Sequence, residues 1–251
     1  TIYWCGFIIM KIRIVRRGKE PQFQLHKELN ADLWKDGELK GPVREALIKI
    51  ATEFYNSLEV DAPLEDIRFT GSLANFNYTP LSDIDLHLVI DFDKVDENTK
   101  LVKNYFDAKR GNWNKKHFIT VKDHEVEVYV ENINEFHQST GVYSLLNDQW
   151  ILTPLPVEGE VDLTVGDKKA EALKKEIDDA IALEDNLNHL RRLKEKIRKM
   201  RKCGLQERGE FSPENLAFKI LRNTGYLNKL SKAITKEYDR QYSLPEEMAR
   251  T

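Results

Sequence analysis

The sequence predicts an α/β domain, with a mixed sheet and flanking helices, followed by an α-helical domain. Up to about residue 155, short aliphatic runs alternate with stretches in which apolar residues recur every three or four positions. Pro154, Pro156, Gly159 and Gly166 then mark a boundary. Beyond it the apolar residues keep a helical period. We therefore expect domains at residues 10–160 and 161–251.

The composition is that of a protein with a packed core and a strongly solvated surface. Hydrophobic residues make up 41% of the 251 positions, charged residues make up 32%, and the mean hydropathy is −0.56. A net charge of −3 argues against broad, non-specific coating of nucleic acid. The two cysteines, Cys5 and Cys203, form no spacing pattern, which argues against a zinc site or a disulfide framework. We expect a cytoplasmic protein.

The most apolar stretch is the N-terminal TIYWCGFIIMKIRIV. It is too short to span a bilayer and has no basic residues before its apolar run, so we expect neither a membrane anchor nor a signal peptide. Met10 is our candidate for the natural start, which leaves it open whether residues 1–9 are native. Ile12, Ile14 and Val15 then predict a first strand.

A helix is predicted next. Gly41-Pro42 opens it, because proline is well tolerated in the first turn. Apolar residues from Val43 to Leu58 then recur at three- and four-residue spacing and form one stripe. We expect this stripe to pack against the strand that follows, at residues 67–70.

The central stretch, residues 69–91, carries the chemistry. Its strand ends on Gly71-Ser72, a polar loop follows, and Asp83 and Asp85 then alternate with aliphatic residues. Because strand side chains alternate between faces, the two carboxylates share one face, about 7 Å apart. Both can reach a divalent cation. Gly71 lets the backbone approach a phosphate, and Ser72 adds a hydroxyl and an N–H donor at an expected helix start.

Gly-Ser, ten intervening residues and Asp-Ile-Asp resemble the pattern of the polymerase-β-like nucleotidyltransferases. The surrounding TGSLANFNYTPLSDIDLH is similar to predicted nucleotidyltransferases of bacteriophages. The resemblance implies a palm domain that binds an NTP and two Mg²⁺ (or Mn²⁺) ions through three carboxylates, transfers a nucleoside monophosphate and releases pyrophosphate. In this reading Asp83 and Asp85 hold the metals, and Gly71 and Ser72 bind the β- and γ-phosphates.

The resemblance requires a third carboxylate on a neighbouring strand. A helix is predicted at residues 93–110, with a hairpin after it whose strands cover residues 118–121 and 125–131. Glu127, between two valines, fits the third position best, although the family more often has aspartate there. Glu125 shares its face and is the second choice. His87 lies beside Asp85 on the same face, but we expect a structural role for it.

Two aromatic residues and a basic segment add hypotheses. A base could stack on Tyr143 or Trp150, but packing of these rings is the preferred interpretation. One long helix is predicted from residue 164 or 167 to about residue 202, and a second begins at Ser212 and is interrupted at Gly225. The first helix ends on eight basic residues: Arg191, Arg192, Lys194, Lys196, Arg198, Lys199, Arg201 and Lys202.

This basic run exceeds what a helix dipole requires, so an RNA-phosphate-binding face is a hypothesis, with contacts from Arg191, Arg192, Arg198 and Lys199. We therefore expect a Mg²⁺-dependent nucleotidyltransferase that moves a nucleoside monophosphate from an NTP to an acceptor hydroxyl. The sequence does not identify the acceptor, and an RNA 3′ end is the one that would suit the basic helix. Synthesis of cyclic or linear oligonucleotides and modification of a protein or small molecule are alternatives. A catalytically inactive nucleotide- or RNA-binding module is the alternative from another class. No motif specifies the NTP or the oligomeric state.

Overall fold

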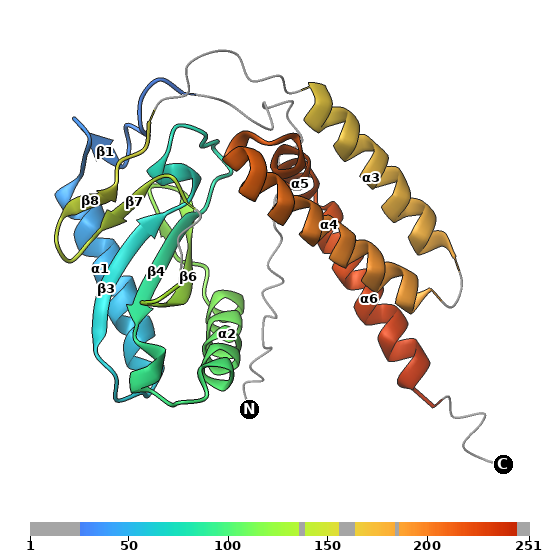
Figure 1. The fold of residues 1–251 in the computed structure, drawn as a ribbon, viewed down its shortest axis with the longest axis horizontal. Helices are drawn as coiled ribbons and strands as arrows, with labels where there is room; N and C mark the ends of the chain where they lie inside the picture. The colour runs from blue at the N-terminus through green and yellow to red at the C-terminus, as the bar shows by residue number, and fades with distance from the viewer. Residues whose placement is uncertain (1–25, 136–138, 156–163, 184–185, 245–251) are drawn as a thin grey trace, which may run out of the picture.

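The computed structural model describes residues 26–135, 139–155, 164–183 and 186–244 (Figure 1). The predicted start at Met10, the predicted strand at residues 12–15 and the apolar N-terminal stretch lie outside these ranges. So does most of the predicted domain boundary, at residues 156–163, and the boundary therefore remains a prediction.

A six-stranded mixed sheet forms the first unit. Its order is β5-β6-β4-β3-β7-β8, with β4 and β6 parallel and the other neighbours antiparallel. The strands are β3 (Leu64–Thr70), β4 (Ile84–Ile90), β5 (Thr120–Val121), β6 (His124–Asn132), β7 (Val142–Ser144) and β8 (Gln149–Leu152). A separate antiparallel pair, β1 (Trp34–Lys35) and β2 (Glu38–Leu39), precedes them. The predicted α/β class with a mixed sheet is confirmed.

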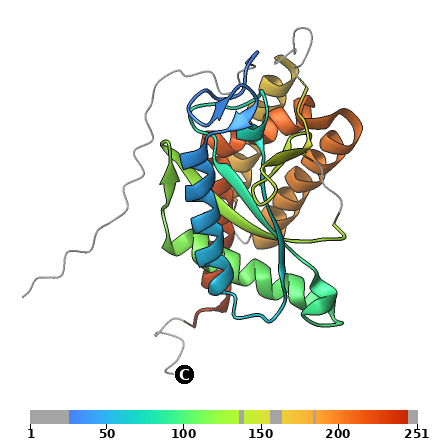
Figure 2. The same ribbon diagram turned by 90° about the vertical axis from the view of Figure 1, so that its left-hand side faces the viewer.

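Helices α1 (Gly41–Asn56) and α2 (Thr99–Lys116) pack with the aliphatic face of this sheet (Figures 1 and 2). Leu47, Phe69 and Phe106 are fully buried in the core that results. The predicted stripe of α1 is confirmed, and Pro42 lies in its first turn. Because α1 and α2 pack against the aliphatic face, the polar side chains of β4 and β6 lie on the opposite face.

The predicted bounds of α2, residues 93–110, are wrong. The helix begins after Asn98, whose side chain accepts a hydrogen bond from the N–H of Leu101. It also continues through Gly111, because the residues beyond that glycine have tertiary partners. Trp113 packs on Phe54, with ring centroids 5.3 Å apart. Asn114 exchanges two hydrogen bonds with the backbone of β6, which offsets the low helix propensity of glycine.

The segment that contains Tyr143 and Trp150 forms the hairpin β7–β8. Tyr143 is buried, and its ring meets Trp34 and Trp150 edge-on. Trp34 and Trp150 stack with centroids 4.7 Å apart. The preferred interpretation of packing is therefore confirmed for Tyr143, which has no free face on which a base could stack.

Helices α3 (Thr164–Ala182), α4 (Leu187–Arg208), α5 (Pro213–Asn223) and α6 (Tyr226–Tyr242) form a second unit with its own core. They fit the predicted α-helical domain. The single long helix expected to residue 202 is instead two helices, α3 and α4. The reason lies at Asn186, whose side chain donates to the carbonyls of Ala180 and Leu183 and so satisfies the end of α3.

The start and the interruption of the second predicted helix are confirmed. Ser212 caps α5 by accepting from the N–H of Asn215, and Pro213 is its first residue. Gly225, with φ of +80°, separates α5 from α6. None of the helices among the described residues is long and apolar enough to cross a membrane.

One carboxylate joins the two units. Glu210 lies between α4 and α5, and it accepts hydrogen bonds from Asn77 Nδ2 at 2.7 Å, from Thr140 Oγ1 at 3.3 Å and from Asn75 Nδ2 at 3.4 Å. Its backbone carbonyl accepts from Asn215 Nδ2 at 2.7 Å. Asn75, Asn77 and Asn215 are buried. We call this junction the Glu210 node.

Glu210→Ala should therefore lower the free energy of unfolding by about 1–3 kcal/mol, because it leaves the buried amide of Asn77 without its acceptor. Urea denaturation followed by circular dichroism measures the change. Glu207→Ala, at an exposed position near the end of α4, is the matched control and should change stability by less than about 0.5 kcal/mol. Equal effects of the two substitutions would contradict the role of the node.

Candidate active site

The polar face of the sheet is organised by the parallel pairing of β4 with β6. Asp85 lies directly opposite Glu127 in this register, while Ile84 lies opposite Val126 and is buried. The alternation predicted from the sequence is thus confirmed for both strands. Asp83 immediately precedes β4, close enough for its charge to act on Asp85. Because Glu127 is the residue paired with Asp85, the geometry favours it over Glu125 as the third carboxylate.

Only glycine fits at position 71, because the backbone there lies against Asp85. The φ of Gly71 is +81°, a conformation that side chains disfavour, and a Cβ at this position would lie 1.9 Å from Asp85 Oδ2. The backbone at the end of β3 therefore touches the carboxylate of β4. Ser72 follows in a short 3₁₀ turn rather than in the α-helix expected there, and its hydroxyl donates to Ser82 Oγ at 2.8 Å.

The carboxyl group of Asp85 has an unusual environment. Burial, followed by the nearby charges of Glu127 and Asp83, raises its pKa to about 6. His87 and Arg222 act in the opposite direction. A carboxyl group at such a position takes up a proton more readily than an ordinary aspartate, and a nearby cation opposes this shift.

Glu127 is oriented by its neighbour on the strand. Tyr129 donates a hydrogen bond from its hydroxyl to Glu127 Oε2 at 2.7 Å, and the Arg110 guanidinium lies 4.8 Å from the centre of the tyrosine ring. Burial and the negative charges of Asp85 and Glu127 raise the pKa of Tyr129 well above its ordinary range. Tyr129 therefore stays protonated and keeps donating to Glu127.

His87 has the structural role that the sequence suggested. Its Nδ1 lies 2.9 Å from Glu131 Oε2, and the other carboxylate oxygen of Glu131 accepts from Arg68 at 2.8 Å. Arg68 is also 3.5 Å from Asp66. This network extends the polar face away from Asp85. It holds the side chains of His87, Arg68 and Glu131 in place.

Three cations of the helical unit approach the carboxylates, and the sequence analysis did not assign them to the site. Lys219 and Arg222 of α5 and Arg201 of α4 all interact electrostatically with Asp85. Burial lowers the pKa of the Lys219 ammonium to about 8. Arg201 lies 4.3 Å above the ring of Phe218. One sequence feature could have revealed two of these cations. Lys219 and Arg222 lie three residues apart on a largely apolar helix, and therefore on one side of it.

The donor set suits a hard divalent cation. Asp83, Asp85 and Glu127 offer carboxylate oxygens, which Mg²⁺ and Mn²⁺ prefer, and the charges of Glu127 and Asp83 contribute, after burial, to the raised pKa of Asp85. The described residues nevertheless contain no three His, Cys, Asp or Glu side chains arranged as a ready metal site. Carboxylates without a cation repel one another, and one oxygen of Glu127 is bonded to Tyr129.

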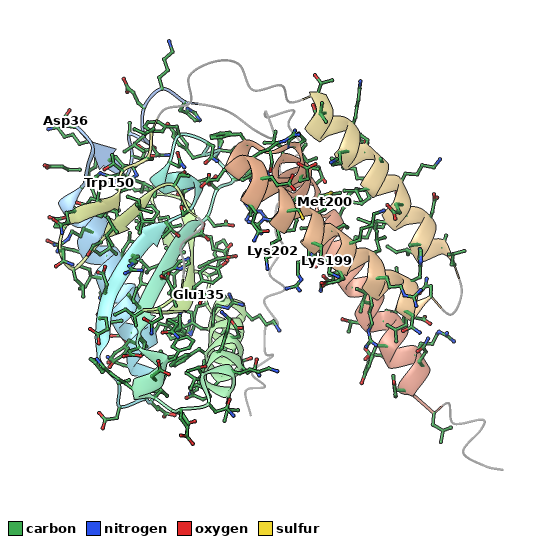
Figure 3. All side chains as sticks on the ribbon, viewed as in Figure 1. Asp36, Glu135, Trp150, Lys199, Met200 and Lys202 are labelled. Atoms are coloured by element: carbon green, nitrogen blue, oxygen red, sulfur yellow. The ribbon has the colours of Figure 1, made fainter. Side chains whose placement is uncertain are left out.

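The four cations predicted to contact RNA do not share one face of α4. Arg191 and Arg198 lie seven residues apart on one line, and Arg192 and Lys199 lie on another. Arg191 lies over the ring of Tyr238 at 5.4 Å, and Arg198 is bonded to Glu195. Figure 3 shows Lys199, Met200 and Lys202 along the same helix.

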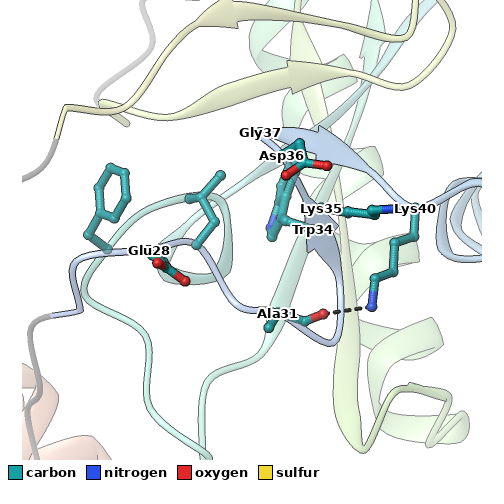
Figure 4. A pocket seen from close by; sticks show the side chains of 9 residues that line it. Glu28, Ala31, Trp34, Lys35, Asp36, Gly37 and Lys40 are labelled. Atoms are coloured by element: carbon teal, nitrogen blue, oxygen red, sulfur yellow. Dashed lines mark hydrogen bonds between the residues drawn. The ribbon is translucent and has the colours of Figure 1, made fainter.

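A cavity of about 560 Å³ lies beside the β1–β2 pair (Figure 4). Trp34, Phe76 and Lys40 are among the residues that line it, and none of the predicted site residues does. The indole N–H of Trp34 donates to the carbonyl of Leu73 at 2.8 Å. This side of the sheet unit therefore supports the turn that carries Ser72.

Comparisons with known proteins add little to this geometry. No family model matches the chain, and no curated protein matches its sequence. Among solved structures it is similar to a STING-associated CdnE c-di-GMP synthase from Capnocytophaga granulosa, with 11% identity over 81% of this chain and 83% of that one. The TM-score of this match is 0.23. The resemblance to bacteriophage proteins remains a prediction.

Gly71→Ala should displace Asp85, because the new methyl group occupies the position of its Oδ2. Gly37→Ala is the matched control, since Gly37 has a φ of +83° but open space around its Cβ. Both substitutions should cost about 1 kcal/mol of backbone strain in urea denaturation. We expect Mg²⁺ to raise the melting temperature of the wild type and of Gly37→Ala, but not that of Gly71→Ala. The same Mg²⁺ response in both variants would contradict the contact.

The metal-free protein should lose stability as the pH rises from about 4 to 7. The pKa of Asp85 is about 6 in the folded protein and 3.8 in the unfolded chain, so the folded state binds the proton more tightly and loses this advantage through that window. Asp85→Asn should remove roughly 3 kcal/mol of this pH dependence, measured by urea denaturation in EDTA. An unchanged pH profile in the variant would contradict the assignment.

Proposed function

We propose that the protein is a metal-dependent nucleotidyltransferase that moves a nucleoside monophosphate from an NTP to an acceptor hydroxyl and releases pyrophosphate. The observation that carries the proposal is the β4–β6 register, which sets Glu127 opposite Asp85 on a polar face that Gly71 approaches with its backbone. The resemblance of the Gly71 to Asp85 segment to polymerase-β-like nucleotidyltransferases supports the same reaction. NTP is the implied substrate.

The chain's own residues would divide the work between two sides of the substrate. Gly71 and Ser72 would bind the β- and γ-phosphates from the sheet unit. Lys219, Arg201 and Arg222 would neutralise the triphosphate from the helical unit, since cations that approach buried carboxylates are also suited to phosphate. Electrostatic stabilisation of this kind is often the largest contribution to phosphoryl chemistry.

Asp83, Asp85 and Glu127 would hold two Mg²⁺ or Mn²⁺ ions. When bound, such ions stabilise charge on the attacking and leaving oxygens and favour deprotonation of the acceptor hydroxyl. Glu127 would also receive or relay that proton, with its orientation maintained by the hydrogen bond from Tyr129. Glu125 remains the alternative for this role.

The acceptor that we propose is an RNA 3′ end. Formation of cyclic or linear oligonucleotides and modification of a protein or small molecule use the same carboxylates and remain alternatives. A catalytically inactive nucleotide- or RNA-binding module is a second candidate function. It is favoured by one observation, that the described residues hold no ready metal site.

Pyrophosphate release from each of the four NTPs, with Mg²⁺ or Mn²⁺ and with or without total RNA, tests the proposal. Asp83→Asn and Asp85→Asn should each reduce the rate by at least about 10³-fold, because loss of a metal ligand removes charge stabilisation that acts in the transition state. Glu127→Gln should be as damaging, and Glu125→Gln should stay within about tenfold of the wild type. The reverse order would transfer the third position to Glu125.

Lys219→Ala provides a second readout. It should raise the KM for NTP more than it lowers kcat, because an ammonium group that binds the triphosphate also acts in the ground state. NTP binding by the wild type without turnover under any condition would favour the inactive binding module.

A further inference from the structure

One flank of α4 carries a regular line of cations. Arg191, Lys194, Arg198 and Arg201 follow one another at spacings of three and four residues, so they lie on the same side of the helix. Contacts with α6 confirm which side this is. Lys194 donates to Ser231 Oγ at 3.2 Å, and Arg191 lies over the ring of Tyr238. With a rise of 1.5 Å per residue, the line is about 15 Å long.

The two ends of this line differ in chemistry. Its inner end is Arg201, which is close enough to Asp85 and Tyr129 for their negative charges to act on it. Its outer end is aromatic, where Tyr238 and Tyr242 stack with ring centroids 4.5 Å apart. Tyr242 is 72% exposed. We call these six residues (Arg191, Lys194, Arg198, Arg201, Tyr238 and Tyr242) the α4–α6 strip.

Three of the four cations of the strip remain available to a ligand, whereas Arg201 donates to Asn215 Oδ1 at 3.2 Å. Arg191, Lys194 and Arg198 are exposed. Arg198 is bonded to Glu195, but its side chain is 78% exposed, and exposed ion pairs of this kind contribute only about 0–1 kcal/mol. A phosphate can therefore replace Glu195 at low cost. Positive side chains that follow a line, with aromatic rings alongside, match the way in which single-stranded nucleic acids are bound.

We propose that a single-stranded polynucleotide binds along the α4–α6 strip, with a base on Tyr242 and its 3′ end directed to Asp85 and Glu127. The direction of the strand rests on the proposed function, because only a strand that ends at the carboxylates presents its hydroxyl there. The binding itself does not depend on turnover. The strip also revises the residues predicted from the sequence, because Arg192 and Lys199 lie outside it and Lys194 and Arg201 belong to it.

Fluorescence anisotropy with a fluorescein-labelled 15-nucleotide single-stranded RNA of mixed sequence, and with the DNA of the same sequence, tests the proposal. Lys194→Glu/Arg198→Glu should weaken binding at least tenfold at low salt and reduce the slope of log K against log salt by about 1.4, or about 0.7 for each lost phosphate contact. Tyr242→Ala should weaken binding about five- to 100-fold.

Arg192→Glu/Lys199→Glu is the matched control, because it reverses the same number of charges on the same helix outside the strip. It should weaken binding less than threefold. Equal losses in the two double variants, or no binding of either oligonucleotide by the wild type at about 50 mM salt, would overturn the proposal. Comparison of the two oligonucleotides distinguishes RNA from DNA as the ligand, and either one bound along the strip supports it.

The same samples separate the strip from the proposed function. Specific binding without nucleotide transfer to the oligonucleotide would leave the strip supported and contradict the polynucleotide acceptor. Transfer to the oligonucleotide that Lys194→Glu/Arg198→Glu does not impair would support the transferase and overturn the strip. Circular dichroism of each variant verifies that it is folded.

Discussion

The parallel pairing of β4 with β6 is the constraint on which the rest of the molecule depends. It puts Asp85 and Glu127 at the same level of the sheet, and the buried valines and leucines between them fix that register from the opposite face. If β6 shifted by one residue relative to β4, Glu127 would point into the core and Val128 would lie on the polar face. Gly71 completes the constraint, because it is the residue that lets β3 end against Asp85.

Concentrating carboxylates on one face creates an electrostatic problem that the helical unit partly solves. Arg222 and Arg201 lie where their charges oppose those of the sheet unit, and Lys219 accompanies them despite the cost of its burial. Burial, together with the charges of Glu127 and Asp83, still raises the pKa of Asp85 to about 6. A site of this kind is suited to bind cations and a polyanion together rather than either alone.

Local patterns predicted the sheet half of this arrangement and not the helical half. Period-two alternation put Asp83 and Asp85 on one face, and the family resemblance pointed to Glu127 on a neighbouring strand, although the roles of all three remain predictions. Lys219 and Arg222 were not found, because their position depends on how α5 docks through the Glu210 node. The break between α3 and α4 was missed for a related reason, since Asn186 ends α3 with side-chain hydrogen bonds that no apolar stripe reveals.

The Glu210 node also has a consequence for biosynthesis. Asn77 and Glu210 are 133 positions apart, so a nascent chain on the ribosome completes the sheet unit long before its partner carboxylate is translated. Until Glu210 and α5 emerge, Asn77 lacks its carboxylate acceptor, and the carboxylate face lacks Lys219 and Arg222. Chaperones would therefore meet the emerging chain with that polar face still open.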